Sequence, residues 1–132
     1  MKKSLLFISI ILFNSTFLSA QVIDFCTAIT KEGHCENHPK KFYIPVGETA
    51  NVFAVVRLLD EVGVSKVEYK IYREVSPDED VYMTSLFQDV KPEMKTFWKK
   101  IAFTQELAYK IYLYTDSGKL LTSARIFVQV DY

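Results

Sequence analysis

Glycine, proline, cysteine and histidine are all scarce in this chain of 132 residues, which contains four, four, two and two of them. The two histidines, His34 and His38, both lie in the N-terminal part, so few side chains are suited to act as a general base at neutral pH. No Gly-x-Ser-x-Gly, His-Glu-x-x-His or glycine-rich phosphate-binding motif occurs. Basic and acidic residues number 16 each, without the clustered positive charge that nucleic-acid binding needs. We therefore expect neither an enzyme nor a nucleic-acid-binding protein.

A long apolar run is also missing, except near the N-terminus. Two lysines precede an apolar stretch over residues 5–13, and Ser19 and Ala20 supply small side chains before Gln21. This order predicts a secretory signal peptide over residues 1–20. The stretch is shorter than the roughly 20 apolar residues that a membrane-spanning helix needs. We expect cleavage before Gln21, no membrane span afterwards, and a secreted or periplasmic product.

Removal of this leader would leave 112 residues, a common size for one domain. Because two lysines leave with it, 14 basic residues would face 16 acidic ones, a formal charge of −2. The ten phenylalanines and eight tyrosines, together with abundant valine and isoleucine, favour β-strands.

Turn residues divide the chain into segments of strand length, and several segments alternate between apolar and polar residues. Val67, Tyr69 and Ile71 form one such apolar set, whereas Lys99 interrupts the set of apolar residues around it. Seven strands are predicted, at about residues 42–45, 49–58, 64–74, 81–88, 94–103, 108–115 and 119–131. Strands of this number, length and spacing predict an all-β, seven-stranded antiparallel sandwich following the signal peptide.

Residues 105–111, with the sequence QELAYKI, resemble the approach to strand F in immunoglobulin-like domains. Tyr109 would be the tyrosine whose hydroxyl bonds back to the preceding corner. Ile111 stands where antibody domains place their second core cysteine. The resemblance covers residues 42–132, and it is closer to fibronectin type III-like or bacterial immunoglobulin-like modules than to antibodies. It implies a fold, which hosts many unrelated functions.

Cys26 and Cys35 are the only cysteines, and an isolated pair in an oxidising compartment most often forms a disulfide. Closing so small a loop stabilises a protein by about 2–3 kcal/mol. We therefore expect a disulfide-closed N-terminal segment over residues 21–41, followed by the sandwich over 42–132. A zinc site that also uses His34 and His38 is the alternative, although the spacing fits no common zinc pattern. Chelation by the two histidines beside an intact disulfide also stays open, but no cofactor is predicted.

Four aromatic residues lie on the outward side of the predicted strands: Tyr72, Tyr112, Tyr114 and Phe127. Aromatic side chains are enriched where proteins bind proteins, and they also stack on sugars. Stabilisation of the sheet by cross-strand pairs is the alternative interpretation. The hypothesis is an exported, non-catalytic binding module with a protein partner in the cell envelope or outside the cell, or a structural role there. A small-ligand domain for carbohydrate or metal is the second hypothesis.

Overall fold

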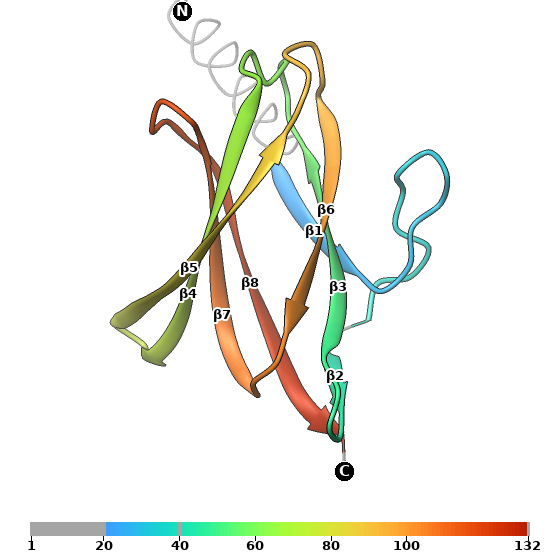
Figure 1. Cartoon of the computed structure of the whole chain (residues 1–132), viewed down its shortest axis with the longest axis vertical. Coiled ribbons are helices and arrows are strands. Elements are labelled where there is room, and N and C mark those ends of the chain that lie inside the picture. The colour runs from blue at the N-terminus through green and yellow to red at the C-terminus, as the bar shows by residue number, and fades with distance from the viewer. Residues whose placement is uncertain (1–20, 40, 132) are drawn as a thin grey trace, which may run out of the picture.

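The computed structural model describes residues 21–39 and 41–131, which form two packed β-sheets (Figure 1). The predicted signal peptide, residues 1–20, lies outside this described part. The three-stranded sheet has the order β1-β3-β6, with β1 at Val22–Cys26, β3 at Ala50–Arg57 and β6 at Thr96–Phe103. The five-stranded sheet has the order β2-β8-β7-β4-β5, with strands at Phe42–Pro45, Leu120–Asp131, Leu107–Thr115, Lys66–Ser76 and Glu79–Asp89. The described residues contain no helix long and apolar enough to cross a membrane.

The prediction of an all-β sandwich is confirmed, with two differences in its strands. The described residues form eight strands, because the N-terminal segment contributes β1, which pairs antiparallel with β3. The sandwich therefore includes residues from Val22 onward. The second difference is that one pair is parallel, since β2 runs alongside the end of β8 with Phe42 opposite Val128. The chain crosses from one sheet to the other between β1 and β2, which brings β2 to this edge.

The core lies between the sheets and is built by the alternating residues identified from the sequence. Val67, Tyr69 and Ile71 of β4 lie beside Ile111 and Leu113 of the neighbouring β7 on the buried inner side of the five-stranded sheet. Burial raises the pKa of the Tyr69 hydroxyl, because the phenolate would lose its hydration. The tyrosine corner is also present, since the Tyr109 hydroxyl donates to the Gln105 carbonyl oxygen at 2.8 Å. That bond fixes the turn from β6 into β7 as the resemblance to immunoglobulin-like domains implied.

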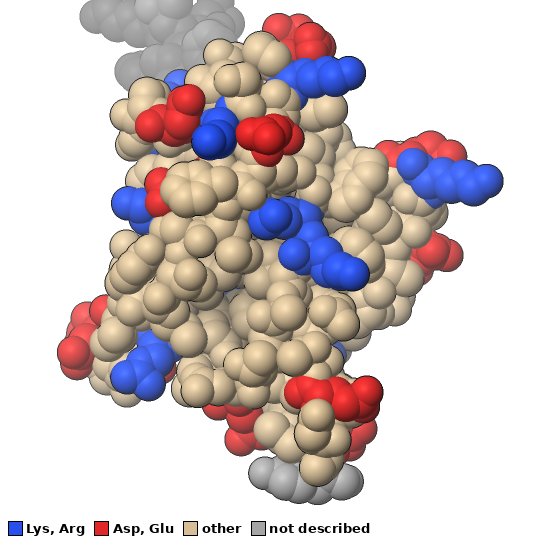
Figure 2. All heavy atoms as spheres, in the orientation of Figure 1, with Lys and Arg blue, Asp and Glu red and all other residues tan. Residues whose placement is uncertain are grey.

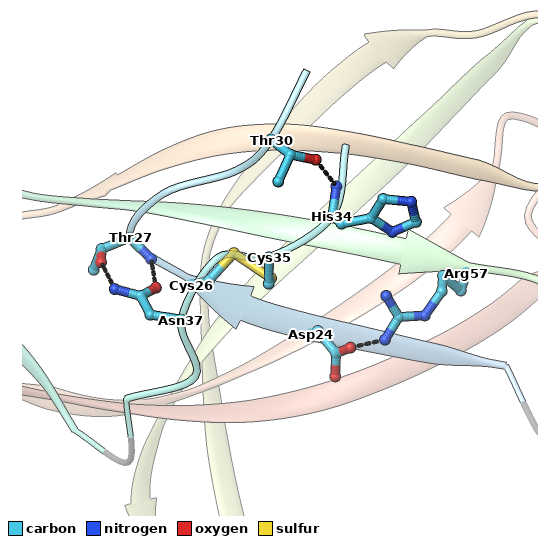
Figure 3. The surroundings of a disulfide bond; sticks show 8 residues. All are labelled: Asp24, Cys26, Thr27, Thr30, His34, Cys35, Asn37 and Arg57. Atoms are coloured by element: carbon cyan, nitrogen blue, oxygen red, sulfur yellow. Dashed lines mark hydrogen bonds and ion pairs between the residues drawn. A yellow bond between two sulfur atoms is a disulfide. The ribbon is translucent and has the colours of Figure 1, made fainter. Parts of the chain in front are cut away.

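The predicted disulfide between Cys26 and Cys35 is confirmed, with 5.7 Å between the two Cα atoms (Figure 3). It closes a loop over residues 27–34, and further bonds join Thr27 in the loop to Asn37 just beyond it. The Asn37 side chain accepts from the Thr27 backbone N–H at 3.2 Å and donates to the Thr27 hydroxyl at 2.8 Å. Figure 1 shows this loop beside the three-stranded sheet.

The loop packs on the outer face of that sheet. Val55 of β3 points away from the core, since its neighbours Ala54 and Val56 point inward, yet it is fully buried. Cys26 is equally buried on the same side. Gly33, at the tip of the loop, lies against the ring of Trp98 from β6. A small second apolar layer therefore forms outside the main core.

Candidate functional site

The outer face of the five-stranded sheet carries most of the aromatic residues predicted to bind a partner. Because Tyr69 and Ile71 point into the core, Tyr72 lies on the solvent side of β4. Tyr112 and Tyr114 point the same way on β7, where Ile111 and Leu113 point inward. The register places Tyr112 opposite Lys70 and Tyr114 opposite Glu68. The three tyrosines predicted as binding residues therefore share one face.

A row of three tyrosines crosses this face from the edge strand inward. The rings of Tyr82 and Tyr72 are 5.6 Å apart at their centroids, and those of Tyr72 and Tyr112 are 5.3 Å apart. Both pairs are edge-to-face, with interplanar angles of 71° and 85°. The two rings of such a pair fix each other's orientation. Each pair contributes about 0.5–1.5 kcal/mol of stability beyond the contribution of the area that it buries. The row is therefore a preorganised surface of phenol rings.

Lysine side chains lie over the remaining aromatic rings of this face. The Lys70 ammonium lies 4.9 Å from the centroid of Tyr114, and the Lys66 ammonium lies 5.8 Å from that of Phe87. Both distances fall in the range of cation–π attraction. We define the aromatic face as Tyr72, Tyr82, Phe87, Tyr112 and Tyr114.

Ion pairs border the aromatic face at the end where β4 turns into β5. The Lys110 ammonium lies 3.2 Å from an Asp80 carboxylate oxygen, and this partner raises the pKa of Lys110. Arg125 of β8 pairs with Glu74 of β4. These four charges neutralise one another in pairs.

Phe127 does not join the other three predicted residues. It points to the same side of the sheet, but it lies opposite Ala108, four residue pairs along the ladder from the pair of Tyr112 with Ser123. It is 40% exposed and lines a separate hollow of about 280 Å³ with Phe25 and His38. The sequence placed Phe127 on the right strand but could not place it relative to the tyrosines.

Two residues of the aromatic face, Tyr82 and Phe87, were missed at the sequence level. The ladder between β4 and β5 is irregular at Met83, so that Tyr82 stands opposite Tyr72 while Thr84 stands opposite Ile71. Strict alternation would have directed Met83 outward and Tyr82 inward. A bulge of this kind has no reliable signal in a single sequence, although the aromatic content of residues 81–88 was visible.

The two cysteines are joined to each other, so they are not available as thiolate ligands in the alternative zinc site. Among residues 21–39 and 41–131, no three histidine, cysteine, aspartate or glutamate side chains are grouped in a way that would hold a metal ion. His34 lies in the disulfide loop, where its backbone N–H donates to the Thr30 hydroxyl at 3.1 Å (Figure 3).

No protein-family model matches the chain, and no curated protein sequence matches it. Its structure is similar to an immunoglobulin-like protein from Pseudomonas aeruginosa, with a TM-score of 0.50 and 12% identity over 83% of this chain and 92% of that one. A superoxide reductase (neelaredoxin) from Ignicoccus hospitalis gives a TM-score of 0.43 at 13% identity, over 85% and 80% of the two chains. A CARDB domain from Pyrococcus furiosus gives 0.39 at 14% identity, over 85% and 96%.

The first of these likenesses, together with the strand order and the tyrosine corner, defines the class of the protein. The chain is an immunoglobulin-like β-sandwich. An identity of 12% shows the fold alone, so the function has to be argued from the surface of this molecule.

Proposed function

We propose that this protein is an exported, non-catalytic immunoglobulin-like module that binds a protein partner through its aromatic face. The observation that carries the proposal is the row of Tyr82, Tyr72 and Tyr112 on the outer side of the five-stranded sheet. Tyrosine supplies a large contact area with little side-chain entropy to lose, and it adds a hydroxyl that hydrogen-bonds at the rim. The ring contacts reduce that entropy further, because they hold the rings in place before a partner arrives.

The geometry of the row favours a protein over the alternative carbohydrate ligand. Sugars stack on the flat faces of aromatic rings. In this row each ring presents its edge to the next, with interplanar angles of 71° and 85°. A protein partner contacts ring edges and hydroxyls as readily as ring faces, so it makes fuller use of this surface.

Export is part of the proposal, and the disulfide supports it. Bonds of this kind persist in oxidising compartments and are rare in the cytosol. We propose that residues 1–20 are removed and that the mature chain acts in the periplasm or outside the cell, within or near the envelope. Mass spectrometry of the protein purified from its native host tests this directly. An N-terminus at Gln21 and two fewer hydrogens for the disulfide are expected, whereas an intact leader with two free thiols would refute it.

The binding proposal is tested by affinity capture from envelope and medium fractions, with quantitative mass spectrometry of what is retained. The test variant is Tyr72→Ala/Tyr112→Ala, and the matched control is Tyr43→Ala, an exposed tyrosine on β2. Loss of two central interface tyrosines commonly lowers affinity tenfold or more. We expect one partner to be retained by wild type and control and lost by the double variant. Equal recovery by all three proteins would refute the proposal, provided that circular dichroism shows the double variant folded.

A further inference from the structure

The sheet orders leave two strands, β5 and β6, as edges on the same side of the sandwich. These strands follow one another in the chain, and Figure 1 shows them close together at one end and diverging toward the other. The side of the molecule between them is therefore not covered by a strand of the described chain.

A single side chain, Gln88 of β5, bridges the two sheets where the edges are close. Its amide oxygen accepts from the Tyr69 hydroxyl at 2.6 Å, and its amide nitrogen donates to the Trp98 carbonyl oxygen at 2.8 Å. Beyond Gln88 the edges separate and a groove of about 380 Å³ opens. We call this the edge groove, and its principal lining residues are Ile71, Met83, Leu86, Lys99, Ile101 and Phe103. The groove is therefore lined mainly by apolar side chains.

The backbone of β6 presents hydrogen-bonding groups along this groove. In an antiparallel ladder the N–H and C=O of one residue point to the same side, and successive residues alternate. The Trp98 carbonyl points away from β3, because it accepts from Gln88, so Lys100 and Ala102 direct their N–H and C=O groups the same way. In the described part of the chain, β6 pairs with β3 alone. The edge at Lys100 and Ala102 is thus open to a further strand.

A cationic side chain interrupts the apolar lining of this groove. Lys99 stands opposite Ala54, on the core-facing side of β6, and is half-buried where the sequence shows an otherwise apolar set. The ion pairs among the described residues use Arg57, Lys110 and Arg125, and not Lys99. Figure 2, in the orientation of Figure 1, shows basic side chains gathered in the middle of this face, where β6 runs. An occupant of the groove would therefore meet an ammonium group that lacks a carboxylate.

We propose that the edge groove binds an extended acidic peptide segment of a partner protein, which adds to β6 as a fourth strand of the three-stranded sheet. The segment would hydrogen-bond to Lys100 and Ala102 and place apolar side chains on Ile101 and Phe103. A carboxylate on the same side of the segment, next to those apolar side chains, would pair with Lys99. Strand addition of this kind takes its affinity from the backbone and its specificity from alternate side chains. The site is separate from the aromatic face, which lies on the outer side of the other sheet.

A second copy of this chain fits the groove less well than an acidic peptide. Pairing β6 with β6 of another copy would bring the lysines at 99 and 100 of both copies together across the new ladder. Like charges across a ladder are destabilising. A small carboxylate with an apolar tail would satisfy Lys99, but it would leave the backbone groups of β6 unused.

The probe is a fluorescein-labelled heptapeptide with Asp, Val and Val at its second, fourth and sixth positions and Ser or Thr between them. Fluorescence anisotropy measures its dissociation constant for the full mature protein. The control peptide carries Lys in place of Asp. We expect the acidic peptide to bind about tenfold more tightly than the control, which corresponds to one favourable charge pair in a partly buried site.

Two protein variants separate the charge from the backbone. Lys99→Glu should abolish the preference for the acidic peptide, whereas Lys119→Glu makes the same charge change at an exposed turn and should preserve it. Ala102→Pro removes an N–H that lies on the open edge and is not bonded to β3, so it should weaken the binding of both peptides. Ala102→Ser keeps this N–H and should bind both peptides as wild type does.

Three results would overturn the proposal. The first is equal affinity of both peptides for the wild-type protein, and the second is full binding by folded Lys99→Glu. The third is displacement of the acidic peptide by decanoate at equal or lower concentration, which would assign the groove to a small amphiphile. Because Tyr72→Ala/Tyr112→Ala leaves the groove intact, it should bind the peptide normally. This separates failure of the groove from failure of the aromatic face.

Discussion

Substitution of Gly33 by alanine tests the packing of the disulfide loop on the three-stranded sheet. Gly33 has a φ of +87°, a conformation that alanine adopts only with strain. A Cβ built at this position would also lie 2.6 Å from Trp98 Cε3 and closer still to Cζ3, well inside van der Waals contact. Alanine therefore incurs two separate costs at this position.

The chain supplies a control that isolates the first cost. Gly118, in the turn between β7 and β8, has a similar φ of +94°, but nothing lies within 4 Å of the corresponding Cβ position. Gly118→Ala should lower the free energy of unfolding by about 1–2 kcal/mol through backbone strain alone. Gly33→Ala adds displacement of a tryptophan ring, for which overpacking data give about 1–3 kcal/mol more.

Urea unfolding followed by circular dichroism measures these differences, and the emission of Trp98 reports the local change. Trp98 is the only tryptophan in the chain, so its emission comes from this contact alone. We expect its emission to shift to longer wavelength in Gly33→Ala before any urea is added, and to stay unchanged in Gly118→Ala. Without the Trp98 ring, Gly33→Ala should cost about as little stability as Gly118→Ala does. The double variant Gly33→Ala/Trp98→Ala should therefore be only slightly less stable than Trp98→Ala.

If Gly33→Ala and Gly118→Ala lose the same stability and both retain the native emission, Gly33 does not pack on Trp98. If the double variant recovers nothing, the loss arises from the backbone alone.

Two further predictions concern the disulfide and the buried phenol. Reduction of Cys26–Cys35 should lower the free energy of unfolding by about 2.5–3 kcal/mol, as chain entropy predicts for a ten-residue loop. It should also shift the emission of Trp98. An unchanged urea midpoint with reductant present would contradict this. Burial raises the pKa of Tyr69 above its value in the unfolded chain. The free energy of unfolding should therefore be unaffected by this group below about pH 10. Above that pH it should fall by about 1.4 kcal/mol per pH unit. Urea midpoints between pH 9 and 11 should decline less steeply in Tyr69→Phe than in wild type, and equal slopes would show that Tyr69 is not the group responsible.

The sequence predicted most strands because period-two alternation survives wherever one face of a strand is buried. Val67, Tyr69 and Ile71 are an example, since all three lie in the core. The tyrosine corner was predictable because it depends on a local bond between Tyr109 and Gln105, four residues apart.

Features that depend on distant pairing could not be predicted in this way. β1 is five residues long and ends at a cysteine, so its alternation is too short to stand out. Its place in the sheet depends on β3, more than 20 residues further along. The position of Tyr82 depends on a bulge opposite β4, and the edge groove depends on which strands have no neighbour. Each of these is a property of the sheet and not of one segment.

The position of β2 has a consequence for the order of folding. β2 joins its sheet only by pairing with β8, the last of the described strands, and Gln21 bonds to Leu121 and Thr122 across about 100 residues of sequence. β2 can therefore join its sheet only after β8 is in place, whereas β1 pairs with β3 independently of β8. Contacts of such long range slow folding, because the intervening chain must be ordered first. A nascent chain in which β8 has not yet been made has no partner for β2, so the closed sandwich forms only once β8 is available.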